Sequence, residues 1–357
     1  MPAVECMIRV GDEEVTDFYR YLKKVEVRMS RTAATTCTIE IDTFRDEKGL
    51  WFVQDSNVFE PWSTLVVEAQ FGRRVEEVMR GYVKAIDVTH PNEMAGSVVV
   101  IKGQDDSLRL DREHVRRVWS REDEPLSDGD IASEIASDND LNSDTEGGLE
   151  NRSLNQDGTS IDFLRRRAEA NGFELFFREG VLNFHSARLD EEPQPPIMLY
   201  AGALTNCLSW SVQHDGHLPD GVRVVRQATD ESSAESEDVD PDLVLLGRRA
   251  ATSASMGLPS FRWTMDRPRG SASEEALVRA RAAANRNAWK ISATGELDGA
   301  RYGHVLLTHK TVPVDGVGDA YGGTYYVDEV THMFSMDGYR QRFKLLRNAT
   351  GDRSSER

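Results

Sequence analysis

The eight histidines are the first residues that could support catalysis or metal binding, and their spacing offers two pairs. His214 and His217 are three residues apart, and His304 and His309 are five apart. A protein metal site needs three or four converging donors, and both pairs lie beside predicted turns without an obvious third ligand. We therefore expect solvated or strand-end histidines and no metal site.

An acidic run and an arginine run are the next candidates. Asp138 to Asp144 resembles a calcium loop, but a frame that starts at Asp140 puts Thr145 where glycine is needed and Asn151 where glutamate is needed. We expect a solvated loop there. The arginines at 165–167 could bind phosphate or a partner's acidic surface, or form the solvated face of a helix.

No catalytic motif accompanies these residues. The sequence has no GxSxG, HExxH, Walker loop or strand-linked GxGxxG. The three cysteines, Cys6, Cys37 and Cys207, are far apart and form no CxxC pair. We therefore expect each of them to be a small, buried, apolar side chain in a strand. We predict no catalytic, cofactor-binding or metal-binding residue, no cofactor and no enzyme. Paired carboxylates of a glycoside hydrolase follow no spacing rule, so that alternative stays open.

Length and charge limit the remaining functions. A chain of 357 residues suits two or three domains. The net charge of −18 argues against a protein that grips nucleic acid, although an acidic channel wall would let nucleic acid slide past. The sequence contains no apolar stretch long enough for a membrane span and no signal peptide. We expect synthesis in the cytoplasm, followed by retention there or export within a larger particle.

Alternating apolar and polar side chains dominate the first hundred residues. Tyr21–Arg28 and Thr35–Asp42 alternate with period two, and similar runs follow up to Lys102. Several strands with one apolar face must close or stack. We predict a first tube-like antiparallel β-barrel over residues 1–105, with residues 197–228 as a candidate to complete it.

The sequence pattern changes in residues 106–196, where helices are predicted between short strands. Ser127 can cap a short helix, and Thr159 can cap a better one in which Ile161, Leu164 and Ala168 form an apolar stripe. Two short strands around Gly180 complete a small inserted α+β domain.

The last third of the sequence again shows the patterns of β-strands. Residues 243–350 are predicted to form a second tube-like β-barrel with a helix at about 273–289, and residues 351–357 a flexible tail. Residues 229–242 are acidic and predict an exposed loop. Tyr82–His90 also echoes Tyr326–His332, which indicates two related β domains. The expected fold class is mostly β, with two barrels and an α+β insertion.

Two segments resemble a known family. The first, Ser153 to Leu189, combines Gln-x-x-Thr-Ser, an Asp-Phe-Leu helix, Ala-Glu-x-x-Gly and strands around Gly180. The second is Gly323 to His332, followed by Asp337-Gly338-Tyr339 and a strand that ends in Leu345-Leu346-Arg347-Asn348. With the order β, α+β, β, these segments resemble the phage tail hub proteins called late control protein D, which are similar to the hub portion of VgrG spike proteins.

This resemblance implies a structural role. Three copies would present six barrels in a pseudo-sixfold ring that adapts a hexameric tail tube to a trimeric spike, in a phage tail or a contractile injection system. The implied partners are the chain itself as a homotrimer, a tail tube protein and other baseplate proteins, with DNA or payload passing an acidic lumen unbound. Since no spike sequence follows residue 357, we expect a separate spike protein. The location would be the virion baseplate or an injection particle.

Two alternatives come from other classes. A tail-associated cell-wall hydrolase predicts muralytic activity that depends on one acidic pair. A glycan- or receptor-binding module predicts binding of the isolated chain to host envelopes, because β-rich domains with exposed Trp and Tyr can hold sugars.

Overall fold

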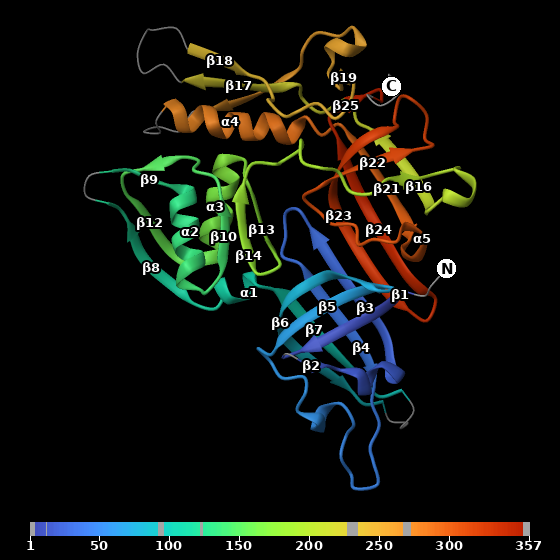
Figure 1. Cartoon of the computed structure of the whole chain (residues 1–357). Helices are drawn as coiled ribbons and strands as arrows, with labels where there is room; N and C mark the ends of the chain where they lie inside the picture. The colour runs from blue at the N-terminus through green and yellow to red at the C-terminus, as the bar shows by residue number, and fades with distance from the viewer. Residues whose placement is uncertain are drawn as a thin grey trace.

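The described residues between 4 and 105 form a curled antiparallel sheet around one apolar core (Figure 1). The computed structural model describes residues 4–11, 13–91, 96–121, 124–226, 235–266 and 273–352. Alternation places Val25, Val27, Ile39 and Ile41 in the core, each fully buried. The elements are β1 (Val4–Val10), β2 (Glu13–Glu14), η1 (Thr16–Tyr21), β3 (Leu22–Ser30), β4 (Thr36–Asp42), η2 (Gln54–Ser56), β5 (Thr64–Phe71), β6 (Arg74–Thr89) and β7 (Val98–Asp105).

The inserted α+β domain has its own core, which contains Trp119, Ile131 and Leu164. Ser127 and Thr159 cap its two longer helices as predicted, and Gly172 ends the second helix in the left-handed conformation. Its elements are α1 (Ser107–Leu110), β8 (His114–Trp119), β9 (Leu126–Ser127), α2 (Asp128–Asp138), β10 (Asn142–Thr145), β11 (Glu150–Asn151), β12 (Leu154–Thr159), α3 (Ser160–Asn171), β13 (Glu174–Arg178) and β14 (Val181–His185).

The second barrel encloses another core, around Tyr325, Val327 and Leu345. Beside it, a helix packs on a small three-stranded sheet through Ala280 and Ala284. The barrel consists of β15 (Ile197–Met198), η3 (Gly202–Leu204), β16 (Cys207–His214), β21 (Ile291–Asp298), α5 (Gly299–Tyr302), β22 (Thr311–Asp315), β23 (Gly323–Ser335) and β24 (Gly338–Arg347). The remaining elements are β17 (Gly221–Arg226), β18 (Glu235–Val239), β19 (Arg249–Ala250), η4 (Ala254–Met256), β20 (Arg262–Asp266), α4 (Ser273–Asn287) and β25 (Ala349–Thr350).

These elements confirm the predicted fold class, but several of the expected boundaries are wrong. The second barrel begins before residue 243, because β15 and β16 belong to it, and the predicted helix packs on the small sheet instead of this barrel. Residues 197–228 do not complete the first barrel, because β15 pairs with β22, β16 with β21, and β17 with β18 and β20. Alternation shows that a segment is a strand and which face is buried; it does not name the neighbouring strand.

The acidic segment 229–242 also departs from the prediction. Residues 229–234 of this segment lie outside the described part of the chain. Residues 353–357 lie outside it too, so the prediction of a flexible tail stays a prediction. Residues 235–239, however, form strand β18 instead of a loop. Asp238 bonds to Arg223 of β17 at 2.6 Å, so the acidic side chains face basic partners across the pair.

The echo between Tyr82 and Tyr326 corresponds to a repeated topology. The first barrel contains the strand order β3-β4-β7-β6, and the second contains β16-β21-β24-β23, which is the same winding. A β-bulge interrupts β6 between Val83 and Ala85 and interrupts β23 between Val327 and Glu329. In both strands the bulge follows directly after a Tyr-Val pair, so the sequence echo marks equivalent positions.

The two faces of β23 give a test of this arrangement. Val330 is 1% exposed in the second core, whereas Thr331 lies between Arg342 and Arg28 on the opposite face. We expect Val330→Asp to lower the free energy of unfolding by at least about 3 kcal/mol, since it buries an unpaired charge. Thr331→Asp should be neutral or stabilising. Chemical denaturation of both variants measures the difference, and equal destabilisation would contradict the assigned register.

Candidate assembly face

One sheet runs without interruption through both barrels. Along one edge, strand β23 has two successive partners. Its first part pairs with residues 311–314 of β22, and its residues 329–335 pair with β3. The sheet therefore passes from β24 through β23 to β3 and on into the first barrel. We call the β23–β3 pairing the seam. It hydrogen-bonds the two barrels through backbone groups, so they form one continuous surface.

The outward face of this sheet is mainly polar, although Val98, Val100 and Met333 also lie on it. Eight strands contribute to it in the order β16-β21-β24-β23-β3-β4-β7-β6. Their outward side chains alternate with the buried core residues. The charged members include Lys24, Glu26, Arg28, Glu40, Asp42, Asp87, Lys102, Glu296, Asp298, Glu329, Arg340, Arg342 and Lys344.

Acidic and basic side chains are interleaved on this face. Lys102 contacts Asp87 at 2.5 Å, and Arg342 contacts Glu296 at 2.9 Å. Lys24 and Arg28 both reach Glu26, and the pKa of that carboxyl is lowered although its partial burial opposes the shift. The face is thus mixed in charge, and the net charge of −18 is not concentrated on it.

Both ends of this eight-stranded path are free among the described residues. At one end no strand pairs with the outer edge of β16; at the other, β5 leaves β6 at Tyr82, so residues 84–89 have an open edge. Val88, which precedes the end of β6, is 42% exposed. Its counterpart in the repeated winding, His332, is fully buried because β3 covers it in the seam.

A buried polar cluster joins the inserted domain to both barrels. Tyr326 of β23 donates to Glu174 of β13 at 2.5 Å. Arg31, next to β3, donates to Asp328 at 3.1 Å and lies 3.5 Å from Glu174. Burial raises the pKa of Glu174 despite the opposing effect of Arg31. Burial and the Glu174 carboxylate together raise the pKa of Tyr326 well above its usual range. This cluster holds the inserted domain next to the seam, through Glu174 of β13.

The expectation of solvated or strand-end histidines is wrong for His309, which is buried, whereas His217 is exposed and His214 ends β16. His304 bonds to Glu76 of β6 at 2.9 Å and so links the two barrels. His309 stacks on Phe176 of the inserted domain with ring centroids 3.8 Å apart, and burial lowers its pKa well below the usual value. His214 and His217 contact Tyr321 and Phe261, respectively. No group of three metal-binding side chains converges within the described residues.

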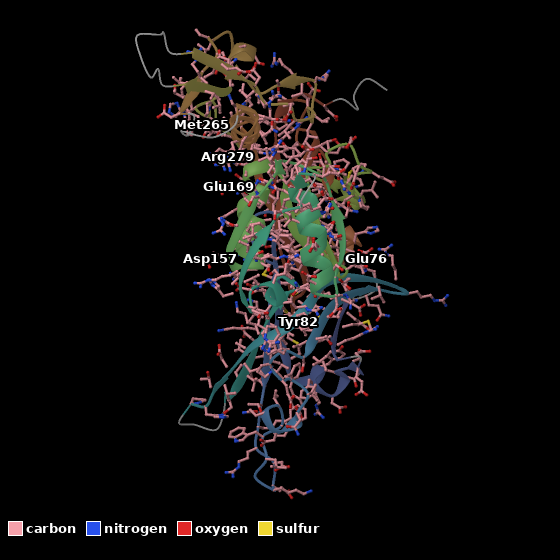
Figure 2. The ribbon with its side chains drawn as sticks, turned by 90° about the vertical axis from the view of Figure 1, so that its left-hand side faces the viewer. Glu76, Tyr82, Asp157, Glu169, Met265 and Arg279 are labelled. Carbon is pink, nitrogen blue, oxygen red and sulfur yellow. The ribbon has the colours of Figure 1, made fainter. Side chains whose placement is uncertain are left out.

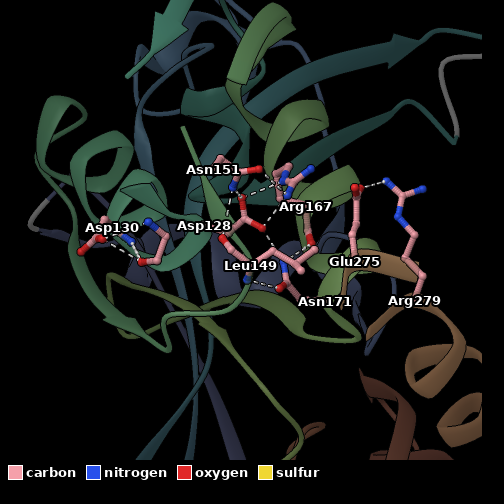
Figure 3. A network of polar contacts seen from close by, with 9 residues as sticks. Asp128, Asp130, Leu149, Asn151, Arg167, Asn171, Glu275 and Arg279 are labelled. Carbon is pink, nitrogen blue, oxygen red and sulfur yellow. Dashed lines mark hydrogen bonds and ion pairs between the residues drawn. The ribbon is translucent and has the colours of Figure 1, made fainter. Parts of the chain in front are cut away.

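The acidic and arginine runs are also dispersed into ion pairs. Asp138 binds Arg117 at 3.1 Å, and Asp144 forms two bonds with Arg188. Of the three arginines, Arg165 and Arg166 are exposed, but Arg167 is partly buried. It forms a fork with fully buried Asp128, which Asn151 and Asn171 also contact (Figure 3). The spacing of Arg167 could not reveal this role, since its partner lies 39 residues away.

The cysteines are free thiols; Cys37 and Cys207 are buried, and burial raises the pKa of Cys207 to about 11. Among the described helices, none is long and apolar enough to cross a membrane.

The amino-acid sequence was compared with models of known protein families. A family model described as the Alg8 N-terminal domain matches residues 1–335. The chain belongs to this family. A sequence search among curated proteins finds no match to this member of the Alg8 N-terminal domain family.

Solved structures share the fold of this Alg8 N-terminal domain chain. The 43 kDa tail protein of prophage MuSo2 from Shewanella oneidensis matches with a TM-score of 0.70 and 14% identity, over 98% of this chain and 100% of that one. A tail protein from Neisseria meningitidis MC58 gives 0.66 and 13%, over 97% of each chain. The E. coli c3393 protein, a component of the type VI secretion system, gives 0.58 and 10%, over 97% of this chain and 77% of that one. The fold is therefore that of phage tail proteins.

The connection between the first barrel and the insertion predicts a pH effect. Asp106 is 5% exposed between β7 and α1. Burial and neighbouring Asp105 raise its pKa to about 6, although Arg109 and Arg80 act in the other direction. A carboxyl whose pKa is higher in the folded chain holds extra protons there, so stability is lost as pH rises from about 4 to about 6.

We expect Asp106→Asn to be more stable than the parent chain at pH 8 by about 2 to 3 kcal/mol. Little difference should remain near pH 4. Denaturation curves across this range measure the effect, with Asp111→Asn, an exposed position at the end of the same short helix, as the control. A parent–variant difference that does not change with pH would rule out this origin.

Proposed function

We propose that the chain is a structural tail hub of the late control protein D type. Three copies form a ring that adapts a sixfold tail tube to a threefold spike, in a phage tail or a contractile injection system. The partners are a tube protein, a separate spike protein and other baseplate proteins, and the protein resides in the baseplate. The proposal assigns it no catalytic step.

One observation carries this proposal: the seam inside the chain is a template for contact between chains. In the seam, the last strand of one four-stranded winding, β23, pairs with the first strand of the other, β3. The strands left free are β6, the last of the first winding, and β16, the first of the second. Pairing β6 of one copy with β16 of the next would repeat the seam.

Strand direction supports such a contact. Every neighbouring pair along the eight-stranded path is antiparallel. Since the number of strands is even, β16 and β6 run in opposite directions, and their meeting would again be antiparallel. The two edges differ, so the contact is head-to-tail, which closes into a ring when the rotation fits. With two equivalent windings per chain, three copies give pseudo-sixfold symmetry.

The polar outward face then suits the wall of the channel. A wall that carries both signs in ion pairs offers a passing polyanion no net attraction, and affinity for nucleic acid depends on unneutralised basic groups. DNA or a protein payload could pass without binding. In this proposal the channel wall is mixed in charge, with ion pairs such as Lys102–Asp87 and Arg342–Glu296.

The ring is tested by the native mass of the chain from low to molar salt. We expect a threefold mass, and we expect Val88→Asp to abolish it, because the charge would be buried at the β6 edge. Val118→Asp is the matched control, since Val118 is 59% exposed on β8 of the inserted domain. Circular dichroism should show both variants folded. A trimer that survives Val88→Asp would refute this edge as the interface, and a chain that stays monomeric throughout would argue against self-assembly.

A further inference from the structure

Trp62 occupies a backbone position that normally selects glycine. Residues 60–63 form a turn in which the Ser63 N–H donates to the Glu60 carbonyl at 3.0 Å. Pro61 precedes Trp62, whose φ is 75°. Proline second and a left-handed residue third are the pattern of a type II turn, where glycine or asparagine avoids the steric conflict. A bulky aromatic residue in this conformation is an outlier.

Packing does not explain the tryptophan either. Its side chain is 43% exposed, and it is absent from the core of the first barrel. The backbone still needs the turn, because Trp62 N–H donates to Val83 at 2.8 Å where β5 begins. The chain thus accepts an unfavourable conformation at a position that exposes an indole. Strain of this kind is common at binding sites, where a partner recovers the lost stability.

The indole forms part of the wall of a groove between the first barrel and the inserted domain. The groove has a volume of about 860 Å³, and its lining includes Trp62 and Tyr82 of the first barrel and Arg109 and Arg112 of the segment that leads into the inserted domain. Figure 2 shows Tyr82 at this boundary. The guanidinium carbon of Arg112 lies 5.0 Å from the centre of the Trp62 ring, and that of Arg109 lies 6.0 Å from the Tyr82 ring.

Arginines outnumber carboxylates in the lining of the groove. Three arginines and two carboxylates, Glu113 and Asp138, line it. Asp138 is engaged by Arg117, the third arginine, at 3.1 Å. Arg112 is exposed, and no carboxylate of the described residues forms an ion pair with it. In a chain with a net charge of −18, a stacked arginine without a carboxylate partner indicates an anionic ligand.

We propose that this groove is a docking site for an extended, acidic peptide segment of a partner protein. A carboxylate of the segment binds Arg112, and a neighbouring apolar side chain covers the exposed face of Trp62. Tryptophan and arginine are the residues that most often dominate such contacts. Val115, Arg117 and Trp119, which are alternate residues of β8, also line the groove, so one face of this strand would contact the side chains of an extended segment. This site is independent of the proposed ring, since every residue in it belongs to one chain.

The test selects ligands from a library of random displayed peptides on the full-length chain. We expect acidic peptides with one apolar anchor to be enriched. Trp62→Gly should weaken their binding at least about tenfold, while the midpoint of thermal unfolding stays level or rises because glycine suits the turn. Trp263→Ala, which removes another indole that is 54% exposed, should change neither quantity.

A double-mutant cycle then identifies the carboxylate contact. In a selected peptide, the glutamate that contributes most to binding is changed to glutamine. This change should weaken binding to the parent chain but should not further weaken binding to Arg112→Ala. Three results would overturn the proposal: enrichment of peptides without acidic residues, equal binding by Trp62→Gly, or no enrichment. A lower unfolding midpoint for Trp62→Gly would show that the indole serves packing.

Discussion

The pairing of β23 with β3 is the constraint on which the rest of the structure depends. A strand at the edge of a barrel exposes backbone groups that must find partners. The seam satisfies them by joining one barrel to the other over residues 329–335 and 24–30. Because β23 also pairs with β22 in its first part, one strand belongs to both barrels. Their relative orientation follows from backbone hydrogen bonds, which tolerate little slippage when one face is buried.

The other parts of the chain are arranged so that they leave this sheet undisturbed. The inserted domain and the small sheet with α4 have separate apolar cores. The insertion reaches the barrels through polar contacts such as Tyr326–Glu174 and the bond from Arg178 to the Thr308 carbonyl, at 2.7 Å. Buried polar bonds are directional and fix a geometry more than they add stability. They suit a domain that must hold one orientation behind the seam without covering the polar face.

The sequence was informative wherever the pattern is local. Alternation identified β3 and β4, and Thr159 with Gly172 delimited α3, because period and caps are encoded within a few residues. The spatial neighbours of a strand were not encoded in this way: β16 was a candidate to complete the first barrel, but it pairs with β21 of the second barrel, about 80 residues later. The same limit hid the contacts of Arg167 and Tyr326 and the groove at Trp62. Only the Pro61-Trp62 pair before a strand signalled the turn, and nothing local showed that it faces Arg112.

The treatment of strand edges links the seam to assembly. Natural sheets protect long edges with charges, bulges or covering segments, since an open edge pairs with other chains. Here β1 carries a short cover, β2, over residues 9–10, and β22 is capped by β15. Strand β16 and residues 84–89 of β6 have no cover among the described residues, and each leaves an apolar side chain, Leu208 or Val88, partly exposed. Two uncovered edges of opposite direction, at the ends of a sheet whose middle already contains the equivalent pairing, are what a chain needs in order to join its own copies.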